Sequence, residues 1–304
     1  MSRCYARFVL TRIKRSFSGF SSETTLTEVD RLMMAVMMWL AAIMAYGASL
    51  GMTQDSGSGI LLGMSEDAVD DMYDGCKKEM ARKAEGYLPN EKNQDQNFKR
   101  AWCEAELYVK GKFQKTLHRN KKIPNSIGKE QITAIYVYTL DHPPIYLDFN
   151  AAVRSQRSEY KTTFKYHALH FFLTDAIQKL RSRQEEPGKC WTTFSRKKTL
   201  FRLRSRNTLI RFGGFMSTSM GGYPKPETYG DKTCFNVTTC FGADISLYSK
   251  FGDFEKEVLI PPYEIFKVTK VEKRTAKKTL PCEVVYTLKS TGTPLSNLNC
   301  SLVF

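Results

Sequence analysis

Two glutamates, Glu255 and Glu257, are separated by one residue and stand directly before the apolar run VLIPP. Residues i and i+2 of a strand point to the same face, so we expect both carboxylates to project into one cleft. One carboxylate of such a pair can stabilise a developing positive charge, while the other positions or deprotonates a nucleophile. Cleavage of a bond to a ribose passes through an oxocarbenium-like state, which glycosidase carboxylates also stabilise. The pair alone is not specific, because an E-x-E sequence on an exposed strand is usually a solvated surface.

Two hydroxyl residues with the same spacing, Ser217 and Ser219, follow the glycines Gly213 and Gly214 in the segment GGFMSTS. A hydroxyl group can orient a ribose or a carboxylate through hydrogen bonds. Glycine lets the backbone approach a ligand closely, because it has no side chain. An S-x-S sequence is also common, so only its combination with the two glutamates indicates a site.

The elements that must position these residues follow from the hydrophobic pattern of residues 60–304, which we interpret as one domain. Residues 66–118 are predicted to be helical with a break at 90–97, and residues 164–180 to form another helix. The β-branched and aromatic run at 132–140 predicts a strand. After Cys190, short runs rich in Phe, Val, Thr and Tyr predict a β-rich half. Helices followed by strands indicate an α+β fold.

The chain is strongly basic. The 304 residues include 46 Lys and Arg against 31 Asp and Glu, which gives a net charge of +15. Such a surplus attracts anions, among them nucleotide phosphates, acidic surfaces and nucleic acid. The sequence has no zinc-finger spacing, RNP-like strand or basic-region heptads, so nothing beyond charge supports a nucleic-acid partner. Eight cysteines without a CxxC pair, and only four histidines, predict no metal site.

The N-terminal residues 1–54 have the layout of a signal peptide or signal anchor. Residues 32–54 carry no charge and follow a set of basic residues: Arg3, Arg7, Arg12, Lys14, Arg15 and Arg31. The apolar run is long enough to cross a bilayer, since about 20 residues suffice. We therefore expect the secretory pathway, with a secreted protein or a type II membrane anchor at the cell surface. Only four residues follow Cys300, so we expect no GPI signal.

The order and spacing of three segments, FGGFMSTS, CFGADISLYSKF and FEKEVLIPPYEIFKV, closely resemble the vertebrate ecto-ADP-ribosyltransferase family. The class is the arginine-specific R-S-E class, and the chain is similar to fish-like members. The segments YTLDHPPIYLDFNAAVR and FKYHALHFFLTDAIQKL extend the resemblance to about residues 60–300. It implies an ADP-ribosyltransferase fold, in which an N-terminal helical part is followed by two packed β-sheets that enclose an NAD cleft.

The resemblance also implies the activity and the role of each residue. ADP-ribose would pass from NAD or NADP to an arginine of an acceptor protein, with release of nicotinamide and without a metal, on a monomer. Glu257 would stabilise the oxocarbenium-like ribose, and Glu255 would orient or deprotonate the acceptor guanidinium. Ser217 would hold the nicotinamide ribose and position Glu257, and Tyr138 and Ser219 would contact the cofactor.

One position departs from the family pattern, which is C-x-x-V-Y-R-G with an arginine that grips NAD. Counting from Cys190 places Ser195 where that arginine is expected, and serine cannot supply a bidentate cationic group. Arg196 is one residue further, and one step along a strand turns a side chain to the opposite face. A local bulge would re-aim it, so Arg196 is predicted as the substitute contact. Gly214 also differs, because many members carry Gln there.

Three functions therefore stay open at this stage. The first is an active arginine-specific transferase. The second is a catalytically impaired binding module on the same fold, which the serine at position 195 favours. The third is NAD hydrolysis with water as the acceptor.

The resemblance also predicts disulfides, and two tripeptides fit N-glycosylation. Cys76 would pair with Cys282, and Cys190 with Cys240. Asn236 and Asn299 each begin an N-x-S/T sequon. Three cysteines that the resemblance leaves without a partner are Cys103, Cys234 and Cys300.

Overall fold

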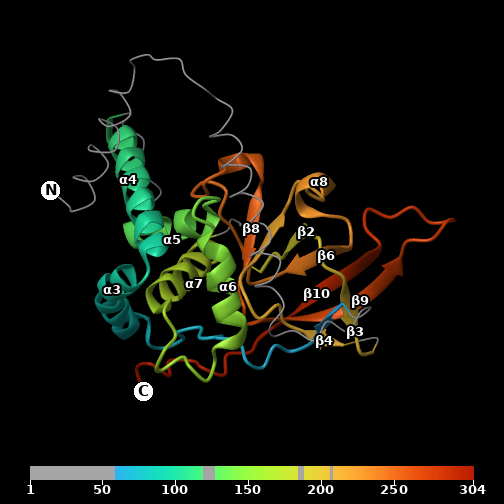
Figure 1. The fold of residues 1–304 in the computed structure, drawn as a ribbon, viewed down its shortest axis with the longest axis horizontal. Coiled ribbons are helices and arrows are strands. Elements are labelled where there is room, and N and C mark those ends of the chain that lie inside the picture. The colour runs from blue at the N-terminus through green and yellow to red at the C-terminus, as the bar shows by residue number, and fades with distance from the viewer. Residues whose placement is uncertain (1–58, 119–126, 184–187, 206–207) are drawn as a thin grey trace, which may run out of the picture. The chain divides into compact units, whose positions relative to one another are not determined.

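The computed structural model describes residues 59–118, 127–183, 188–205 and 208–304 (Figure 1). The predicted leader, residues 1–54, lies outside these ranges. Residues Gly59–Phe304 form one compact unit, in which the longer helices gather on one side and most of the strands on the other (Figure 1). The α+β prediction is confirmed. None of the helices within the described ranges has the length and apolarity to cross a membrane.

Five helices make up the first half: α3 (Lys77–Gln94), α4 (Gln96–His118), α5 (Lys129–Thr139), α6 (Ile145–Ser155) and α7 (His167–Arg181). The predicted break at 90–97 is confirmed at Asp95, which separates α3 from α4. The Asp95 carboxylate accepts hydrogen bonds from the backbone N–H groups of Asn97 and Phe98 at 2.9 and 3.0 Å. It thereby satisfies donors that the first turn of α4 would otherwise leave free.

The predicted strand at 132–140 is wrong, because this segment is helix α5. Every residue from Gln131 to Thr139 is buried, so the helix shows no polar face from which a helical period could be recognised. Its β-branched residues are accommodated by packing and by hydrogen bonds. The hydroxyls of Thr133 and Thr139 donate to the carbonyls of Lys129 and Ile135, four residues earlier, at 2.8 and 3.0 Å.

The strands form a two-stranded parallel sheet and an eight-stranded mixed sheet. The small sheet pairs β1 (Ile60–Leu62) with β3 (Phe201–Leu203). The large sheet has the order β4-β9-β10-β6-β2-β5-β8-β7. Its strands are β2 (Trp191–Lys197), β4 (Leu209–Ile210), β5 (Met216–Ser219), β6 (Thr233–Thr239), β7 (Ala243–Asp244), β8 (Glu257–Ile260), β9 (Glu264–Lys273) and β10 (Val284–Pro294).

The large sheet is joined in its middle by a single residue pair. Strand β2 pairs with β6 over its whole length, but with β5 only through Phe194 and Ser219. The β5-β8-β7 part packs on the helices, because Leu259 and Ala243 belong to the same buried cluster as the helical core. The other part packs in a second buried cluster, which contains Phe235 and Phe266 and to which Met216 of β5 and Ile260 of β8 also belong. The site residues therefore lie on the part of the sheet that contributes to both clusters.

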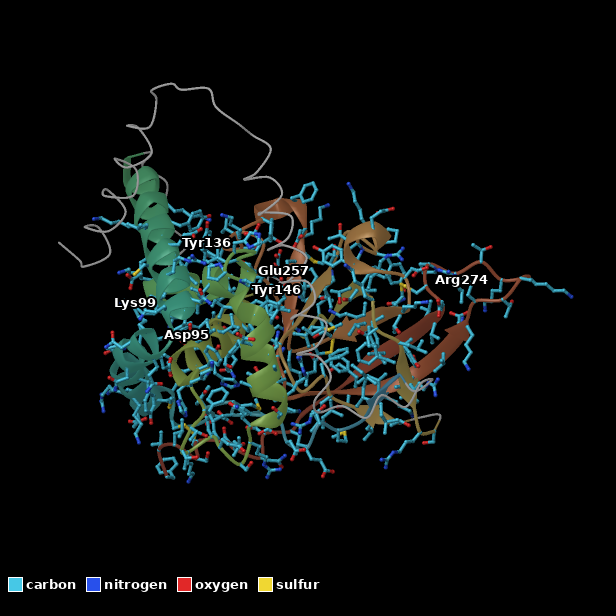
Figure 2. All side chains as sticks on the ribbon, viewed as in Figure 1. Asp95, Lys99, Tyr136, Tyr146, Glu257 and Arg274 are labelled. Atoms are coloured by element: carbon cyan, nitrogen blue, oxygen red, sulfur yellow. A yellow bond between two sulfur atoms is a disulfide. The ribbon has the colours of Figure 1, made fainter. Side chains whose placement is uncertain are left out.

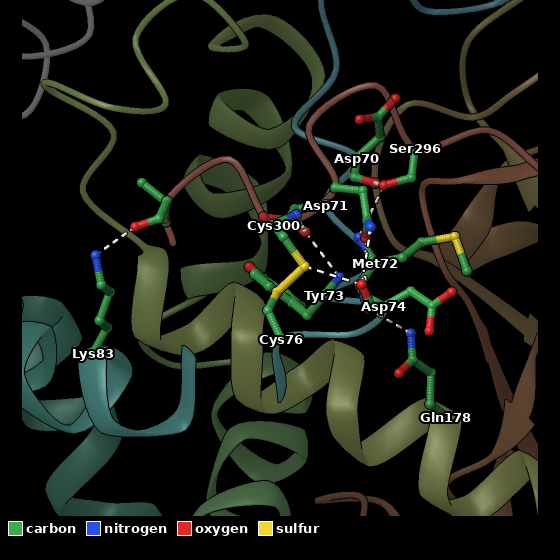
Figure 3. Close-up of a disulfide and its surroundings, with 12 residues drawn as sticks. Asp70, Asp71, Met72, Tyr73, Asp74, Cys76, Lys83, Gln178, Ser296 and Cys300 are labelled. Carbon is green, nitrogen blue, oxygen red and sulfur yellow. Dashed lines mark hydrogen bonds between the residues drawn. A yellow bond between two sulfur atoms is a disulfide. The ribbon is translucent and has the colours of Figure 1, made fainter. Parts of the chain in front are cut away.

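Three disulfides join described residues, and they correct one predicted pairing. Cys190 pairs with Cys240 as predicted. The pairing of Cys76 with Cys282 is wrong, because Cys76 is bonded to Cys300 (Figure 3). Cys282 is bonded instead to Cys234. The reason is the parallel pairing of β6 and β10, which brings the start of β10 alongside that of β6.

The C-terminal residues are tied to the segment before α3. Ser296 donates to the Asp70 carbonyl at 2.7 Å and accepts from the Met72 N–H at 3.0 Å (Figure 3). The N–H of Cys300 donates to the Asp71 carboxylate at 2.9 Å. We call residues 295–300 the C-terminal strap. The strap is more than 220 positions away in sequence from the segment that it contacts, and it completes the edge of the helical core before α3.

The two sequons lie in different settings. Asn236 is on an inner strand of the large sheet, partly buried between β2 and β10. Asn299 is exposed in the C-terminal strap, and its side-chain amide both accepts from and donates to the backbone of Asp74, at 2.8 and 3.0 Å. Glycosylation of either asparagine stays a prediction.

Candidate active site

Glu257 is the buried carboxylate at the centre of the site, near the boundary between helices and strands (Figure 2). Its side chain is held at both oxygens. Oε1 accepts from the Ser217 hydroxyl at 2.6 Å, and Oε2 accepts from the Ser249 hydroxyl at 3.2 Å. The pKa of Glu257 is raised to about 7: burial is the largest cause, the Glu255 charge adds to the rise, and the two donated hydrogen bonds oppose it.

Strand β5 presents the hydroxyls as the alternation predicts. Met216 and Thr218 are buried, whereas Ser217 and Ser219 on the opposite face are partly exposed. The Thr218 hydroxyl donates to the Val258 carbonyl at 2.9 Å, so it is used within the sheet. The Ser219 hydroxyl donates to the Glu255 carbonyl at 2.8 Å, and thus holds the backbone of the second glutamate. The expected contact of Ser219 with a cofactor stays a prediction.

Glu255 reaches the site by a different route from the one predicted. It is not part of β8, because it ends the 3-10 turn η1 (Gly252–Phe254), and Lys256 has a left-handed φ of 44°. Strand alternation therefore does not relate the two glutamates. The turn brings the Glu255 charge close enough to raise the pKa of Glu257. The Glu255 carboxylate accepts a hydrogen bond from the Tyr229 hydroxyl at 2.8 Å, next to the short helix α8 (Pro226–Tyr229).

Helices α5 and α6 hold the backbone that leads into β5. The Tyr138 hydroxyl donates to the Phe215 carbonyl at 2.9 Å and accepts from the Asn150 amide at 3.0 Å. Asn150 in turn accepts from the Phe215 N–H at 2.8 Å. Tyr138 is buried, and burial raises the pKa of its phenol well above the ordinary value. Its hydroxyl thus positions the segment before Ser217, while its contact with NAD stays a prediction.

Gly214 fits this arrangement because it has no side chain. A Cβ atom at this position would lie 2.9 Å from Asn150 Oδ1 and 3.2 Å from Arg154 Nη1. Any larger residue would push these two side chains of α6 away from the backbone. The glycine therefore allows α6 to approach the start of β5.

Arg196 lies outside the site, and the predicted bulge is wrong. Strands β2 and β6 pair without a shift in register from Trp191 to Lys197. The Arg196 guanidinium donates to the Pro281 carbonyl at 2.6 Å and stands over the Tyr223 ring, 5.6 Å from its centroid. Ser195 points to the other face, is buried, and donates to the Ser217 carbonyl at 3.4 Å. Position 195 thus adjoins the site, but its serine carries no charge.

The sequence analysis missed two hydroxyl partners and one cation. Ser249 lies within the segment CFGADISLYSKF, but no spacing rule distinguishes it from Ser246. Tyr229 is bonded to Glu255, yet lies 26 positions away in the sequence. Lys197 could have been recognised, because it is two residues after Ser195 and shares its face of β2. No group of three or more His, Cys, Asp or Glu in the described part of the chain could hold a metal ion.

Comparison with known proteins places this geometry in a family. The family model described as NAD:arginine ADP-ribosyltransferase matches residues 62–285. The chain belongs to this family. Human ecto-ADP-ribosyltransferase 5 is 34% identical over 274 residues, which cover 87% of this chain and 89% of the relative. Human ecto-ADP-ribosyltransferase 4 is 34% identical over 243 residues, with 78% and 71% covered.

Solved structures of the family agree with the fold. One of them is the crystal structure of a mutant of the eukaryotic mono-ADP-ribosyltransferase ART2.2 in complex with NAD. It aligns with this chain with a TM-score of 0.63 and 30% sequence identity. The alignment covers 79% of this chain and 98% of that one. The predicted ADP-ribosyltransferase fold and NAD as co-substrate are confirmed by these comparisons and the family match.

Proposed function

We propose that the chain is an NAD(P)+–protein-arginine mono-ADP-ribosyltransferase, which transfers ADP-ribose to arginine and releases nicotinamide. The observation that carries the proposal is the 2.6 Å hydrogen bond between Ser217 and Glu257, with Glu255 beside them. Residues 60–304 would form the transferase domain. The family match and the resemblance to ART2.2 support the same activity.

Glu257 is the residue that would stabilise the transition state. As the bond from ribose C1 to nicotinamide breaks, its electron pair leaves with the ring nitrogen and positive charge develops on the ribose. A carboxylate fixed at both oxygens stabilises this charge without reorganisation. Ser217 and Ser249 supply that fixation. The step requires ionised Glu257, and a pKa of about 7 leaves roughly half of the molecules ionised at neutral pH.

Glu255 is the residue that would receive the acceptor arginine. It is only partly buried and accepts a single side-chain hydrogen bond, from Tyr229. A guanidinium nitrogen would form the new bond to ribose C1 while Glu255 takes its proton. Phe251 and Phe254 are exposed next to it, with 86% of Phe254 accessible to solvent. Exposed aromatic side chains beside a reactive carboxylate fit a protein acceptor better than water.

The cell-surface setting is also part of the proposal. Residues 1–54 would direct the chain into the secretory pathway and either be cleaved or remain as a type II anchor. Disulfides among the described residues fit an oxidising compartment. We propose a monomer, whose partners are NAD and arginine-bearing proteins, with Asn236 and Asn299 as candidate glycosylation positions.

The proposal is tested with the full chain produced in a secretory host. Nicotinamide release and labelling of poly-arginine are measured together with NAD labelled in the ADP-ribose part. We expect both, and expect Glu257→Gln to reduce both by about 10²–10³-fold. Glu255→Gln should reduce labelling more than nicotinamide release, because it acts on the acceptor. Release without labelling would identify an NAD hydrolase, and absence of both would identify the impaired binding module that Ser195 suggested.

A further inference from the structure

Lys197 ends strand β2 and has no acidic partner among the described residues. It is partly buried, and burial together with the charge of Arg154 lowers the pKa of its amine to about 8. Within the described part of the chain, no carboxylate forms an ion pair with Lys197 or with Arg154. The charge of Arg154 thus acts on Lys197 without a counter-charge in the described structure, and such a pair of cations favours an anion between them.

The two cations flank the backbone that carries the catalytic serine. Lys197 shares a face of β2 with Ser195, whose hydroxyl reaches the Ser217 carbonyl at 3.4 Å. Arg154 comes from α6 and lies against the glycines, since its Nη1 is 3.2 Å from where a Cβ of Gly214 would be. The Arg154 charge also acts on Tyr138, which is bonded to Phe215. The anion would therefore lie beside the ribose that Ser217 and Glu257 serve.

We propose that Lys197 and Arg154 bind the diphosphate of NAD, in place of the arginine that the family pattern puts at position 195. The inference rests on the proposed function for its ligand. Position 197 is two residues from position 195 on the same strand face, about 7 Å further along the chain. A lysine side chain can span most of that distance, and it delivers a point charge rather than a bidentate fork.

A purely structural role would leave a different pattern of contacts. Arg211 is the buried arginine of this fold, and it is paired with Asp70 at 2.6 Å. Arg196 has its donors directed at the Pro281 carbonyl and Cys282 Sγ. Lys197 makes neither kind of contact in the described structure. Its charge is thus available to a ligand.

The test is equilibrium binding of ADP-ribose to the full chain, because ADP-ribose carries the diphosphate but cannot react. We expect Lys197→Met to raise the Kd by about 10- to 100-fold, the range of a charge-assisted hydrogen bond. Lys198→Met is the matched control, since Lys198 is the exposed neighbour. Its Kd should change by less than about twofold, because an exposed single charge contributes little. Thermal unfolding of each variant checks that it folds.

A second variant distinguishes a diphosphate contact from general damage. Ser195→Arg combined with Lys197→Met should bind ADP-ribose nearly as tightly as the unaltered chain, because it restores the family arginine. Equal Kd values for Lys197→Met and Lys198→Met would overturn the inference, as would absence of ADP-ribose binding by the unaltered chain. Turnover of NAD is measured separately. A chain that binds through Lys197 without turnover overturns only the proposed function, and turnover independent of Lys197 overturns only the diphosphate site.

Discussion

Two cations of this molecule differ in whether they have an acidic partner: Arg211, which contacts the C-terminal strap, and Lys197, beside the active site. The Arg211 guanidinium donates to the Asp70 carboxylate at 2.6 Å and to the carbonyls of Met64, Ser65 and Leu295 at 2.7, 3.0 and 2.9 Å. Lys197 has another cation, Arg154, as its electrostatic neighbour. A buried cation that is paired with a carboxylate stabilises the fold. A cation that lies in a site without an acidic partner is available to bind an anionic ligand.

The same contrast separates two buried carboxylates. Glu264 accepts from the Thr239 hydroxyl at 2.5 Å and from the N–H groups of Cys240 and Phe241 at 2.7 and 3.3 Å. It therefore fixes the turn that holds the Cys190–Cys240 disulfide. Within the described residues, Glu257 accepts from two hydroxyls, both of residues that line the site. Burial raises the pKa of both groups, so burial alone does not identify the functional one.

Replacement of Arg211, the cation that is paired with a carboxylate, should have the largest effect on the free energy of unfolding. We expect Arg211→Met to lower the free energy of unfolding by about 3–5 kcal/mol, because it leaves the buried Asp70 carboxylate without its counter-charge. The exposed pair of Arg274 and Asp231 (Arg274 is labelled in Figure 2) provides the control, and Arg274→Met should cost roughly 0–1 kcal/mol. Denaturant unfolding measures both. If both variants lost the same free energy of unfolding, the buried and the exposed ion pair would not differ in their contribution to stability.

Exchange of the two carboxylates for amides should separate activity from stability. Glu257→Gln should reduce turnover of NAD by about 10²–10³-fold, the effect of losing one preorganised electrostatic contact, with little loss of stability. Glu264→Gln should lower the unfolding temperature, because its carboxylate organises three donors. The reverse pattern, with Glu264 controlling turnover and Glu257 controlling stability, would contradict the assignment.

The pH dependence of turnover gives a smaller effect. Because the pKa of Glu257 is raised to about 7, the ionised fraction grows as the pH rises through 7. The sign is therefore a gain of activity from pH 6 to pH 8, by about tenfold for a single ionisation. Initial rates at constant ionic strength measure it. A rate that is flat over this range would show that Glu257 is already fully ionised at pH 6.

The smallest expected effect concerns the stability of the Lys197 variant. Lys197→Met removes a cation that is disfavoured by burial and by the charge of Arg154, so the free energy of unfolding should change by less than about 0.5 kcal/mol, or rise. Denaturant unfolding without nucleotide measures it. A loss as large as that of Arg211→Met would mean that Lys197 has a structural partner, and it would blur the contrast between the two cations.

Much of the site could be predicted from the sequence, because its residues lie in short segments with a family pattern. Ser217 and Glu257 are brought together as predicted, and the alternation of β5 held. The relation of Glu255 to Glu257 was wrong in its geometry, since the left-handed Lys256 interrupts the strand. Alternation is a rule for regular strands, and a positive φ at a non-glycine residue is set by the surrounding contacts rather than by residue type.

The fold class was predictable as well, but individual elements and long-range pairs were not. Helix α5 lacks a polar face, and so the composition of 132–140 favoured the wrong element. The partner of Cys76 depends on how the C-terminal strap returns to the segment before α3. Such closure is a property of the assembled fold, and no local pattern encodes it. The role of Lys197 also depends on Arg154, and only the structure brings this residue of α6 close enough for its charge to act on Lys197.

The C-terminal strap has a consequence for how this chain is made. Asp70, Asp71 and Cys76 lie directly before the first described helix, yet their partners come more than 220 positions later in the sequence. The helical half therefore cannot complete this edge until the C-terminal strap has been synthesised. The Cys76–Cys300 bond also requires an oxidant, so we expect this edge to reach its final state in an oxidising compartment.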